Sequence, residues 1–116
     1  MTTLGRNVKI TAPASAREQA RSLFALLGAE RQEPNPQMDV FLLDGNARVG
    51  YAYVDDAAAL SADQMRVAPW LELTVDDVER RSDELGKLGL ARLEYIDKSH
   101  PYFIGPGGVV FRLAST

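Results

Sequence analysis

The chain has 116 residues, of which 46% are hydrophobic and 25% are charged, and its formal net charge is −3. These values are ordinary for one globular domain, and the acidic balance argues against a nucleic-acid binder, which usually has a basic face. The absence of cysteine excludes a disulfide framework, a thiolate nucleophile and a Cys-based zinc site. No apolar run approaches the roughly 20 residues that cross a bilayer, and residues 1–6 contain no signal-peptide core. We therefore expect a cytoplasmic protein with no membrane or nucleic-acid partner.

The first half of the chain begins with an alternating strand and continues into an amphipathic helix. Val8 and Ile10 alternate with polar residues over 7–11, which is typical of a strand with one buried face. Ser15 and Glu18 have the spacing of a capping box, so we expect the helix to begin at Ser15 and to end before Gly28. Turns are expected at 34–36 and 44–46, and they separate three further predicted strands: Glu30–Glu33, Met38–Leu43 and Arg48–Val54.

The second half repeats this order. An alternating strand is predicted over Trp70–Val75. Asp76 is expected to cap the following helix, with Glu79 three residues further on, and Gly89 is expected to follow the last turn of that helix. A glycine-rich turn is predicted at 105–108, and three strands complete the pattern: Arg92–Ile96, Pro101–Ile104 and Val109–Leu113.

The two halves thus each contain one βαβββ unit, over about 6–54 and about 69–114. Residues 55–68 show no strand pattern, and we interpret them as a linker with room for a helical turn; a flap over a pocket is the alternative. The sequence therefore predicts an α+β fold, built as one domain over residues 1–116 from two tandem units.

This order of elements resembles the vicinal oxygen chelate superfamily, which includes glyoxalases, bleomycin-resistance proteins and extradiol dioxygenases. The resemblance covers essentially the whole chain, and three local phrases carry it: Leu26-Leu27-Gly28 after the first helix, Thr74-Val75-Asp76-Asp77-Val78 at the start of the second, and Gly105-Pro106-Gly107-Gly108 before the last strand. It implies that the two units form a curved mixed sheet shaped as a cup, with the helices on its outer face. It also implies a homodimer.

Enzymes of this superfamily hold a divalent metal with side chains on the inner faces of the first and last strands of each unit. Strand parity places Asn7, Gly50, Trp70 and Arg112 at those positions. Asparagine is a poor transition-metal ligand, glycine and tryptophan offer no lone pair, and arginine is a permanent cation. We therefore expect no metal and no other cofactor.

The residues at these positions suit a ligand-binding site instead. Arg112 is a planar cation with five donors, and Trp70 is a flat surface for stacking on a ring or a cation. Glu72 lies on the same face of its strand as Trp70. The structural alternatives are an Arg112–Glu72 pair across the sheet and a Trp70 that simply fills the cup.

Tyrosines supply further candidates for ligand contact. Tyr51 and Tyr53 lie on one face of the predicted fourth strand, either lining the cup or packed under a helix, and Arg48 lies on the opposite face. Tyr102 belongs to the strand that follows the 97–101 loop.

His100 is the only histidine, and its loop is expected at the mouth of the cup. It is either an exposed surface group or a general base, and a base would need an orienting carboxylate, for which Asp97 is near in sequence only. Nothing places a nucleophile beside it, so a Ser/His/Asp triad is not indicated.

These observations lead to a metal-free relative of the glyoxalase and bleomycin-resistance proteins that binds a small organic molecule in the cup, as in antibiotic sequestration. Catalysis is left open, and binding without it is favoured. One alternative is a metal-independent lyase or isomerase in which Arg112 polarises a substrate oxygen and His100 or Glu72 acts as base. The other is a non-catalytic structural or partner-binding domain.

Overall fold

The protein is described by a computed structural model that covers every residue from Met1 to Thr116. It divides into two compact units, Met1–Ala59 and Leu60–Thr116. None of its helices combines the length and the apolar character that a membrane-spanning helix needs.

Each unit has the predicted order of strand, helix and three strands. The elements of the first unit are β1 (Asn7–Pro13), α1 (Arg17–Leu26), β2 (Glu30–Asn35), β3 (Met38–Leu42) and β4 (Arg48–Val54). Those of the second unit are α2 (Ala62–Arg66), β5 (Leu71–Val75), α3 (Val78–Lys87), β6 (Ala91–Arg92), β7 (Tyr102–Ile104) and β8 (Val110–Ser115).

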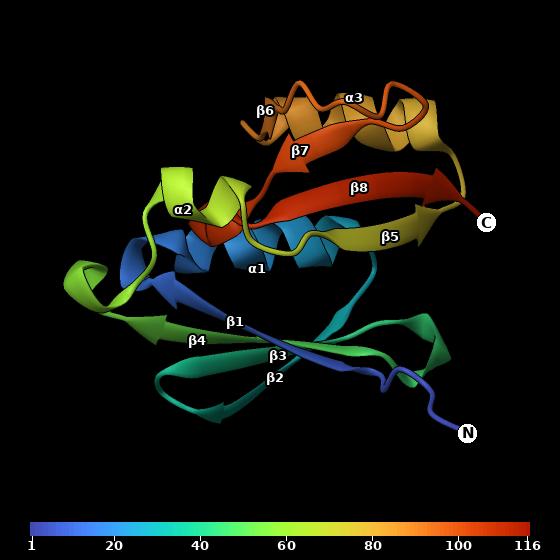
Figure 1. Ribbon diagram of the computed structural model, residues 1–116. Helices are drawn as coiled ribbons and strands as arrows, with labels where there is room; N and C mark the ends of the chain where they lie inside the picture. The colour runs from blue at the N-terminus through green and yellow to red at the C-terminus, as the bar shows by residue number, and fades with distance from the viewer. The chain divides into compact units, whose positions relative to one another are not determined.

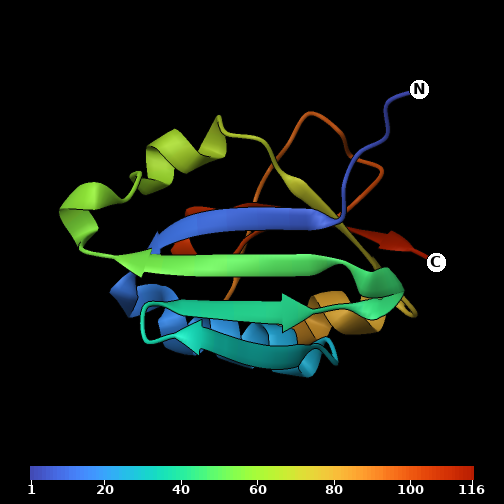
Figure 2. The same ribbon diagram turned by 90° about the horizontal axis from the view of Figure 1, so that it is seen from below.

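The two sheets have the same topology. The strand order is β1-β4-β3-β2 in the first unit and β5-β8-β7-β6 in the second. In each sheet the first strand pairs parallel to the last, and the other pairs are antiparallel. Figure 2 shows the four strands of the first sheet side by side in this order, with α1 behind β3 and β2. The predicted α+β fold, with two tandem βαβββ units, is confirmed.

The helix α1 lies against one face of the first sheet (Figure 1), and aromatic side chains form the core between them. The rings of Phe24 on α1 and Phe41 on β3 stack with centroids 4.5 Å apart, and Tyr51 on β4 meets Phe24 edge-on at 6.1 Å. Tyr51 is 0% exposed and stacks on Tyr53. Of the two placements left open for these tyrosines, the structure shows the one under the helix.

A buried carboxylate lies beside this aromatic core. Asp39 on β3 is 0% exposed and accepts hydrogen bonds from Arg21 on α1, at 2.9 Å and 3.0 Å, and from the Tyr53 hydroxyl at 2.9 Å. Burial alone would raise the pKa of Asp39, but the bonds from Arg21 and Tyr53 outweigh burial and hold it below the ordinary value. Burial, together with the bond to Asp39, raises the pKa of Tyr53.

In the second unit α3 covers one face of the β5-β8-β7-β6 sheet (Figure 1). The buried side chains on this side come from alternate strand positions: Leu73, Val75, Phe103, Phe111 and Leu113, with Leu85 from the helix. The intervening positions, among them Glu72, Tyr102 and Arg112, therefore point to the opposite face.

The helices end as predicted but begin differently. Gly28 and Gly89 follow α1 and α3 with φ of 80° and 91°, a backbone conformation that glycine adopts at little cost. The prediction that Ser15 caps the first helix is wrong, because residues 14–16 form a 3-10 turn and α1 has no side-chain cap. Asp77, not Asp76, caps α3 by accepting from the Arg80 amide at 3.0 Å. The Asp76 side chain instead binds arginines on α3.

Other boundaries also differ from the sequence prediction. The strand β6 covers Ala91–Arg92, so Arg92 alone of the predicted Arg92–Ile96 strand is paired, and 93–101 form a loop. The strand β2 continues through Pro34 to Asn35, so the turn comes later than expected. The predicted linker contains the short helix α2, in agreement with the room expected there for a helical turn, and Ser61 and Gln64 form a complete capping box.

Candidate binding face of the second unit

Four of the predicted site residues meet on the sheet face opposite α3, which we call the Arg112 face. It carries Trp70, Glu72, Tyr102 and Arg112. Glu72 on β5 and Tyr102 on β7 are the register partners of Arg112 on β8, one on each side. Cross-strand partners have neighbouring side chains, so the pairing itself gathers these groups around the Arg112 guanidinium.

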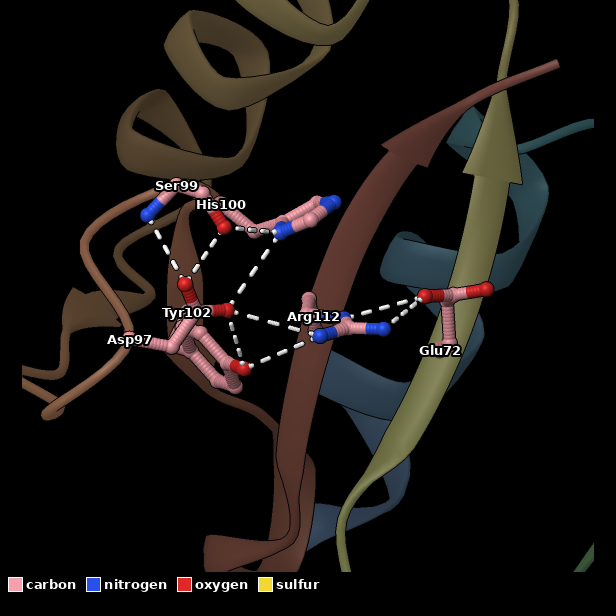
Figure 3. Close-up of polar contacts among 6 residues, drawn as sticks. All are labelled: Glu72, Asp97, Ser99, His100, Tyr102 and Arg112. Atoms are coloured by element: carbon pink, nitrogen blue, oxygen red, sulfur yellow. Dashed lines mark hydrogen bonds and ion pairs between the residues drawn. The ribbon is translucent and has the colours of Figure 1, made fainter.

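Arg112 is held by two carboxylates (Figure 3). Its Nε donates to Oε2 of Glu72 at 3.0 Å, and its Nη2 donates to the same oxygen. On the other side its Nη1 donates to Oδ2 of Asp97 at 3.4 Å and to the Tyr102 hydroxyl at 3.3 Å. The cross-sheet Arg112–Glu72 pair considered from the sequence is therefore present. The bonds to Glu72 and Tyr102 raise the pKa of Arg112, so the group is cationic at any ordinary pH.

Aromatic rings surround the same guanidinium. Its central carbon lies 4.5 Å from the Trp70 ring centroid and 6.0 Å from that of Tyr102. Trp70 and Tyr102 meet edge-on at 5.6 Å, and Tyr95 stacks on Tyr102 at 4.6 Å. Trp70 and Tyr95 keep part of their surface exposed, whereas Tyr102 is 2% exposed. The three rings are thus in contact with one another beside one cation, and Trp70 and Tyr95 supply the exposed aromatic area.

Asp97 connects this face to the 97–101 loop. Its carboxylate accepts from the Ser99 amide at 2.9 Å, from the Ser99 hydroxyl, and from the Tyr102 hydroxyl at 2.9 Å. The bonds from Ser99 are the main reason that the pKa of Asp97 lies well below its ordinary value. Asp97 is therefore ionised wherever the fold is intact near neutral pH.

His100 and Arg112 approach the same oxygen of the Asp97 carboxylate (Figure 3). The Nδ1 atom of His100 is 3.3 Å from Oδ2 of Asp97 and 2.8 Å from the Ser99 hydroxyl oxygen. Asp97 is thus near His100 in space as well as in sequence. The His100 side chain lines a cleft beside α3. Its contact with the Arg112 face is through Asp97.

The charges on the Arg112 face do not balance. Glu72 and Asp97 contribute two negative charges against the single positive charge of Arg112. All three guanidinium nitrogens already donate to groups of the protein. This arrangement is suited to stacking on a planar group and attracting a cation, and it leaves Arg112 poorly placed to grip an anion.

The remaining predicted site residues lie in the first unit. Asn7 on β1 and Arg48 on β4 are register partners, both are exposed, and both lie on the sheet face opposite α1. Arg48 and the tyrosines Tyr51 and Tyr53 are on opposite faces of β4, as parity predicted. The predicted ligand contact of the two tyrosines is therefore not available on the face that carries Asn7 and Arg48.

The residues at the superfamily's metal positions do not fit a metal ion. Asn7 and Gly50 lie on the first sheet, and Trp70 and Arg112 on the second. In the second unit the guanidinium already engages both nearby carboxylates. No group of three or more His, Asp or Glu side chains in the chain has the arrangement of a metal site.

The sequence analysis missed Tyr95 altogether, and it considered Asp97 only beside His100 and not as a partner of Arg112. Residues 92–96 were interpreted as a strand, which hid the fact that Tyr95 and Asp97 share a loop. A usable signal was Asp97-Lys98-Ser99, because Asp followed two residues later by Ser is a frequent Asx-turn pattern, and Ser99 does bond back to Asp97.

Comparisons with solved structures support this fold over the whole chain. A variant of the fosfomycin resistance protein FosX from Listeria monocytogenes, complexed with Mn(II) and 1S,2S-dihydroxypropylphosphonic acid, matches with a TM-score of 0.73 and 14% identity, covering 100% of this chain and 93% of that one. A putative glyoxalase family protein from Bacillus anthracis matches with a TM-score of 0.68 and 16% identity, covering 100% and 98%. An integron cassette protein from the mobile metagenome of V. cholerae matches with a TM-score of 0.66 and 13% identity, covering 99% and 96%.

At these identities the likeness concerns the fold, which is that of the vicinal oxygen chelate group, as the sequence predicted. No protein-family model matches the chain, and no curated protein matches it either.

Proposed function

We propose that this protein binds a small planar or cationic organic molecule on the Arg112 face, without a metal ion, and that it sequesters this molecule rather than converting it. The observation that carries the proposal is the composition of that face. Three aromatic rings border a guanidinium whose charge is exceeded by the two carboxylates bound to it. A cation that stacks on Trp70 gains both the ring interaction and the surplus negative charge.

The same balance argues against an anionic ligand. The FosX variant holds Mn(II) and a phosphonic acid. A phosphonate on the Arg112 face would meet Glu72 and Asp97, and it would have to displace one of them from Arg112 to obtain a donor. Like-charge contacts of this kind cost several kcal/mol at an interface, on the order of a thousandfold in affinity.

The enzyme alternative is less well supported. A residue that polarises a substrate oxygen needs donors aimed at an empty position, but each Arg112 nitrogen already donates to Glu72, Asp97 or Tyr102. The Nδ1 atom of His100, the proposed base, is already engaged by Asp97 and Ser99. An Arg112→Ala variant that loses turnover of an identified substrate, with binding of that substrate retained, would favour this alternative.

Calorimetric titration against ligands matched in size tests the proposal. A planar aromatic cation, a neutral analogue and an aromatic carboxylate are each titrated into the full-length protein. We expect the cation to bind at least tenfold more tightly than the carboxylate, and we expect this difference in affinity to become smaller at high salt. Failure of all three to bind would favour the structural-domain alternative, and tighter binding of the carboxylate would overturn the charge argument.

Glu72→Gln assigns the binding to this face. It removes one negative charge at a half-exposed position, and it should weaken cation binding severalfold. Glu30→Gln is the matched control, because Glu30 is an exposed acid on the edge strand of the first unit. Equal effects of both substitutions would mean that only the overall charge of the protein matters.

We also propose that the protein is a homodimer, as the superfamily resemblance implies. All six residues of the β2 edge strand are exposed, but this edge is an unsuitable interface. Charged side chains at Arg31 and Glu33, and Pro34, which has no amide N–H, disfavour pairing with a strand of another molecule. Light scattering at two concentrations should give the dimer mass at both; the monomer mass at the higher concentration would contradict this.

A further inference from the structure

A separate cleft lies on the α3 side of the second sheet, between α3 and the 97–101 loop; we call it the α3 cleft. Its volume is about 450 Å³, within the range of small-molecule sites. The helix contributes Glu79, Ser82 and Asp83 to its lining, the sheet contributes Arg92 and Phe103, and the loop contributes His100.

Ser82 carries the first sign that something binds there. Its hydroxyl oxygen is the only buried side-chain polar atom of the protein without a hydrogen-bond partner. Buried polar groups nearly always have a partner in the folded state, so a ligand in the cleft that approaches Ser82 would supply the partner that this hydroxyl lacks.

The first unit shows what normally fills this place. Arg21 and Ser82 are each the fifth residue of their helix, and Arg21 reaches Asp39 on the neighbouring strand. In the second unit Pro101 occupies the place of Asp39, because its carbonyl accepts from Leu113, the counterpart of Tyr51. With Ser82 in place of the arginine and Pro101 in place of the aspartate, the second unit has no counterpart of the Arg21–Asp39 ion pair, and the cleft occupies that space.

The helix side of the α3 cleft is acidic, whereas its sheet and loop sides carry the cations Arg92 and Lys98, of which Lys98 is paired with Glu94. Glu79 and Asp83 lie one turn apart on the helix side. On the sheet side the Arg92 guanidinium lies 5.1 Å from the Phe103 ring centroid and forms no ion pair within the protein. A ligand with one charge of each sign matches this arrangement, whereas a singly charged ligand meets one repulsive side.

His100 adds an oriented group at the loop side. Asp97 and Ser99 both approach its Nδ1, which favours the proton on that nitrogen. Nε2, on the other side of the ring, is then an acceptor with no partner in the chain. It is suited to accept from a donor on the ligand.

We propose that the α3 cleft is a second binding site, for a free amino acid as zwitterion. The ligand carboxylate binds Arg92, its ammonium group lies against Glu79 and Asp83, and its polar atoms satisfy Ser82. This site is distinct from the Arg112 face, which lies on the other side of the same sheet, and the two are connected through the contact of His100 with Asp97.

Nuclear magnetic resonance of the isotope-labelled full chain tests the site directly. L-leucine, L-glutamine and L-phenylalanine are titrated separately, together with their N-acetyl forms, which lack the ammonium charge, and their methyl esters, which lack the carboxylate. We expect saturable shifts of the Ser82, Arg92 and His100 amide signals with at least one free amino acid, and at least tenfold weaker binding of both blocked forms. Absence of saturable shifts with all three free amino acids, or equal binding of a blocked form, would overturn the proposal.

A matched pair of arginine variants assigns the contact. Arg92 is the register partner of Phe103, and Arg31 is the register partner of Phe41 at the corresponding place in the first unit. Arg92→Gln should weaken amino-acid binding at least tenfold, Ser82→Ala should weaken it severalfold, and Arg31→Gln should leave it unchanged. Equal loss in the two arginine variants would contradict the site. Cation binding on the Arg112 face should be unaffected by Arg92→Gln, so the two binding claims fail separately.

Discussion

The two units have the same order of elements and the same sheet topology, but they place their ionic networks on opposite sides of the sheet. In the first unit the network lies under the helix, where Asp39 is buried between Arg21 and Tyr53. In the second unit it lies on the face away from the helix, around Arg112. One fold therefore accommodates either arrangement, and neither is required by the topology.

The counterpart positions sharpen this comparison. Lys9 and Val40 flank Gly50 in the first sheet as Glu72 and Tyr102 flank Arg112 in the second. The first unit forms its sheet with no ion network at Gly50, so the cluster on the Arg112 face is not needed for folding as such. That is the strongest reason to regard the cluster as a functional surface.

The largest stability effect is expected at the buried network of the first unit. Asp39→Ala leaves Arg21 and Tyr53 without their acceptor, which should cost about 3 kcal/mol of unfolding free energy, since breaking a buried pair strands its partner. Glu33→Ala removes the exposed partner of the same Arg21 and should cost less than about 1 kcal/mol. Urea unfolding measures both. Equal midpoints for the two variants would show that Asp39 does not anchor the unit.

A second effect is specific to the second unit. A Cβ added at Gly105 would lie 2.5 Å from Cδ2 of the buried Phe111, whereas the first unit has Leu43 and the smaller Val49 at the same places. Gly105→Ala should therefore cost about 2 kcal/mol through overpacking.

The control for this substitution has the opposite sign. An added Cβ at Gly86, in α3, meets no atom within 4 Å, so Gly86→Ala should gain about 0.5 kcal/mol from helix propensity. Thermal unfolding of both variants decides the matter, and a Gly105→Ala variant as stable as the unaltered protein would contradict the packing described here.

The helix starts differ by about 1 kcal/mol in their dependence on a cap. Asp77→Ala removes the side chain that accepts from the Arg80 amide, so it should destabilise by that amount. Ser15→Ala should change stability by no more than about 0.5 kcal/mol, because α1 has no side-chain cap. Chemical denaturation of the pair checks this. If Ser15→Ala lowered the free energy of unfolding as much as Asp77→Ala, the hydrogen bond from the Arg80 amide to Asp77 would not explain the effect at α3.

The smallest effect is expected from acid titration of the second unit. Hydrogen bonds from Ser99 hold the pKa of Asp97 below the ordinary value of about 3.9. Its contribution to stability is therefore present above that pH and is lost as the pH falls towards the folded-state pKa. Asp97→Asn should lose less stability than the unaltered protein on acidification below about pH 4. A carboxyl titration midpoint at or above the ordinary value would remove the basis of this prediction.

The sequence predicted the order and type of the βαβββ elements because alternating strands and glycine-ended helices are local patterns. Parity also placed Glu72 on the face of Trp70, and Arg48 opposite Tyr51, since the side-chain period of a strand is two, and the Arg112–Glu72 pair was one of the alternatives left open. These successes depend on residues adjacent in sequence or in register.

The failures concern interactions that have no periodic signal. Tyr95 lies in a segment that was predicted as a strand but is a loop, and Asp97 joins the cluster from the polar loop that follows it. Asp77 rather than Asp76 caps α3, and Ser15 does not cap α1. The choice between neighbouring cap candidates depends on the exact path of the chain into the helix. The α3 cleft could not be predicted from the sequence. It forms because Ser82 is too short to make the contact across to the sheet that Arg21 makes with Asp39 in the first unit.

Trp70 is the only tryptophan, so its fluorescence reports on the Arg112 face alone. The most direct test of the central claim is a titration of this signal with a planar aromatic cation in the full-length protein. We predict a saturable change that Glu72→Gln weakens severalfold and Glu30→Gln leaves unchanged. A Trp70 signal that stays constant while calorimetry detects binding, or that responds equally to the matched carboxylate, would contradict a cation site on this face.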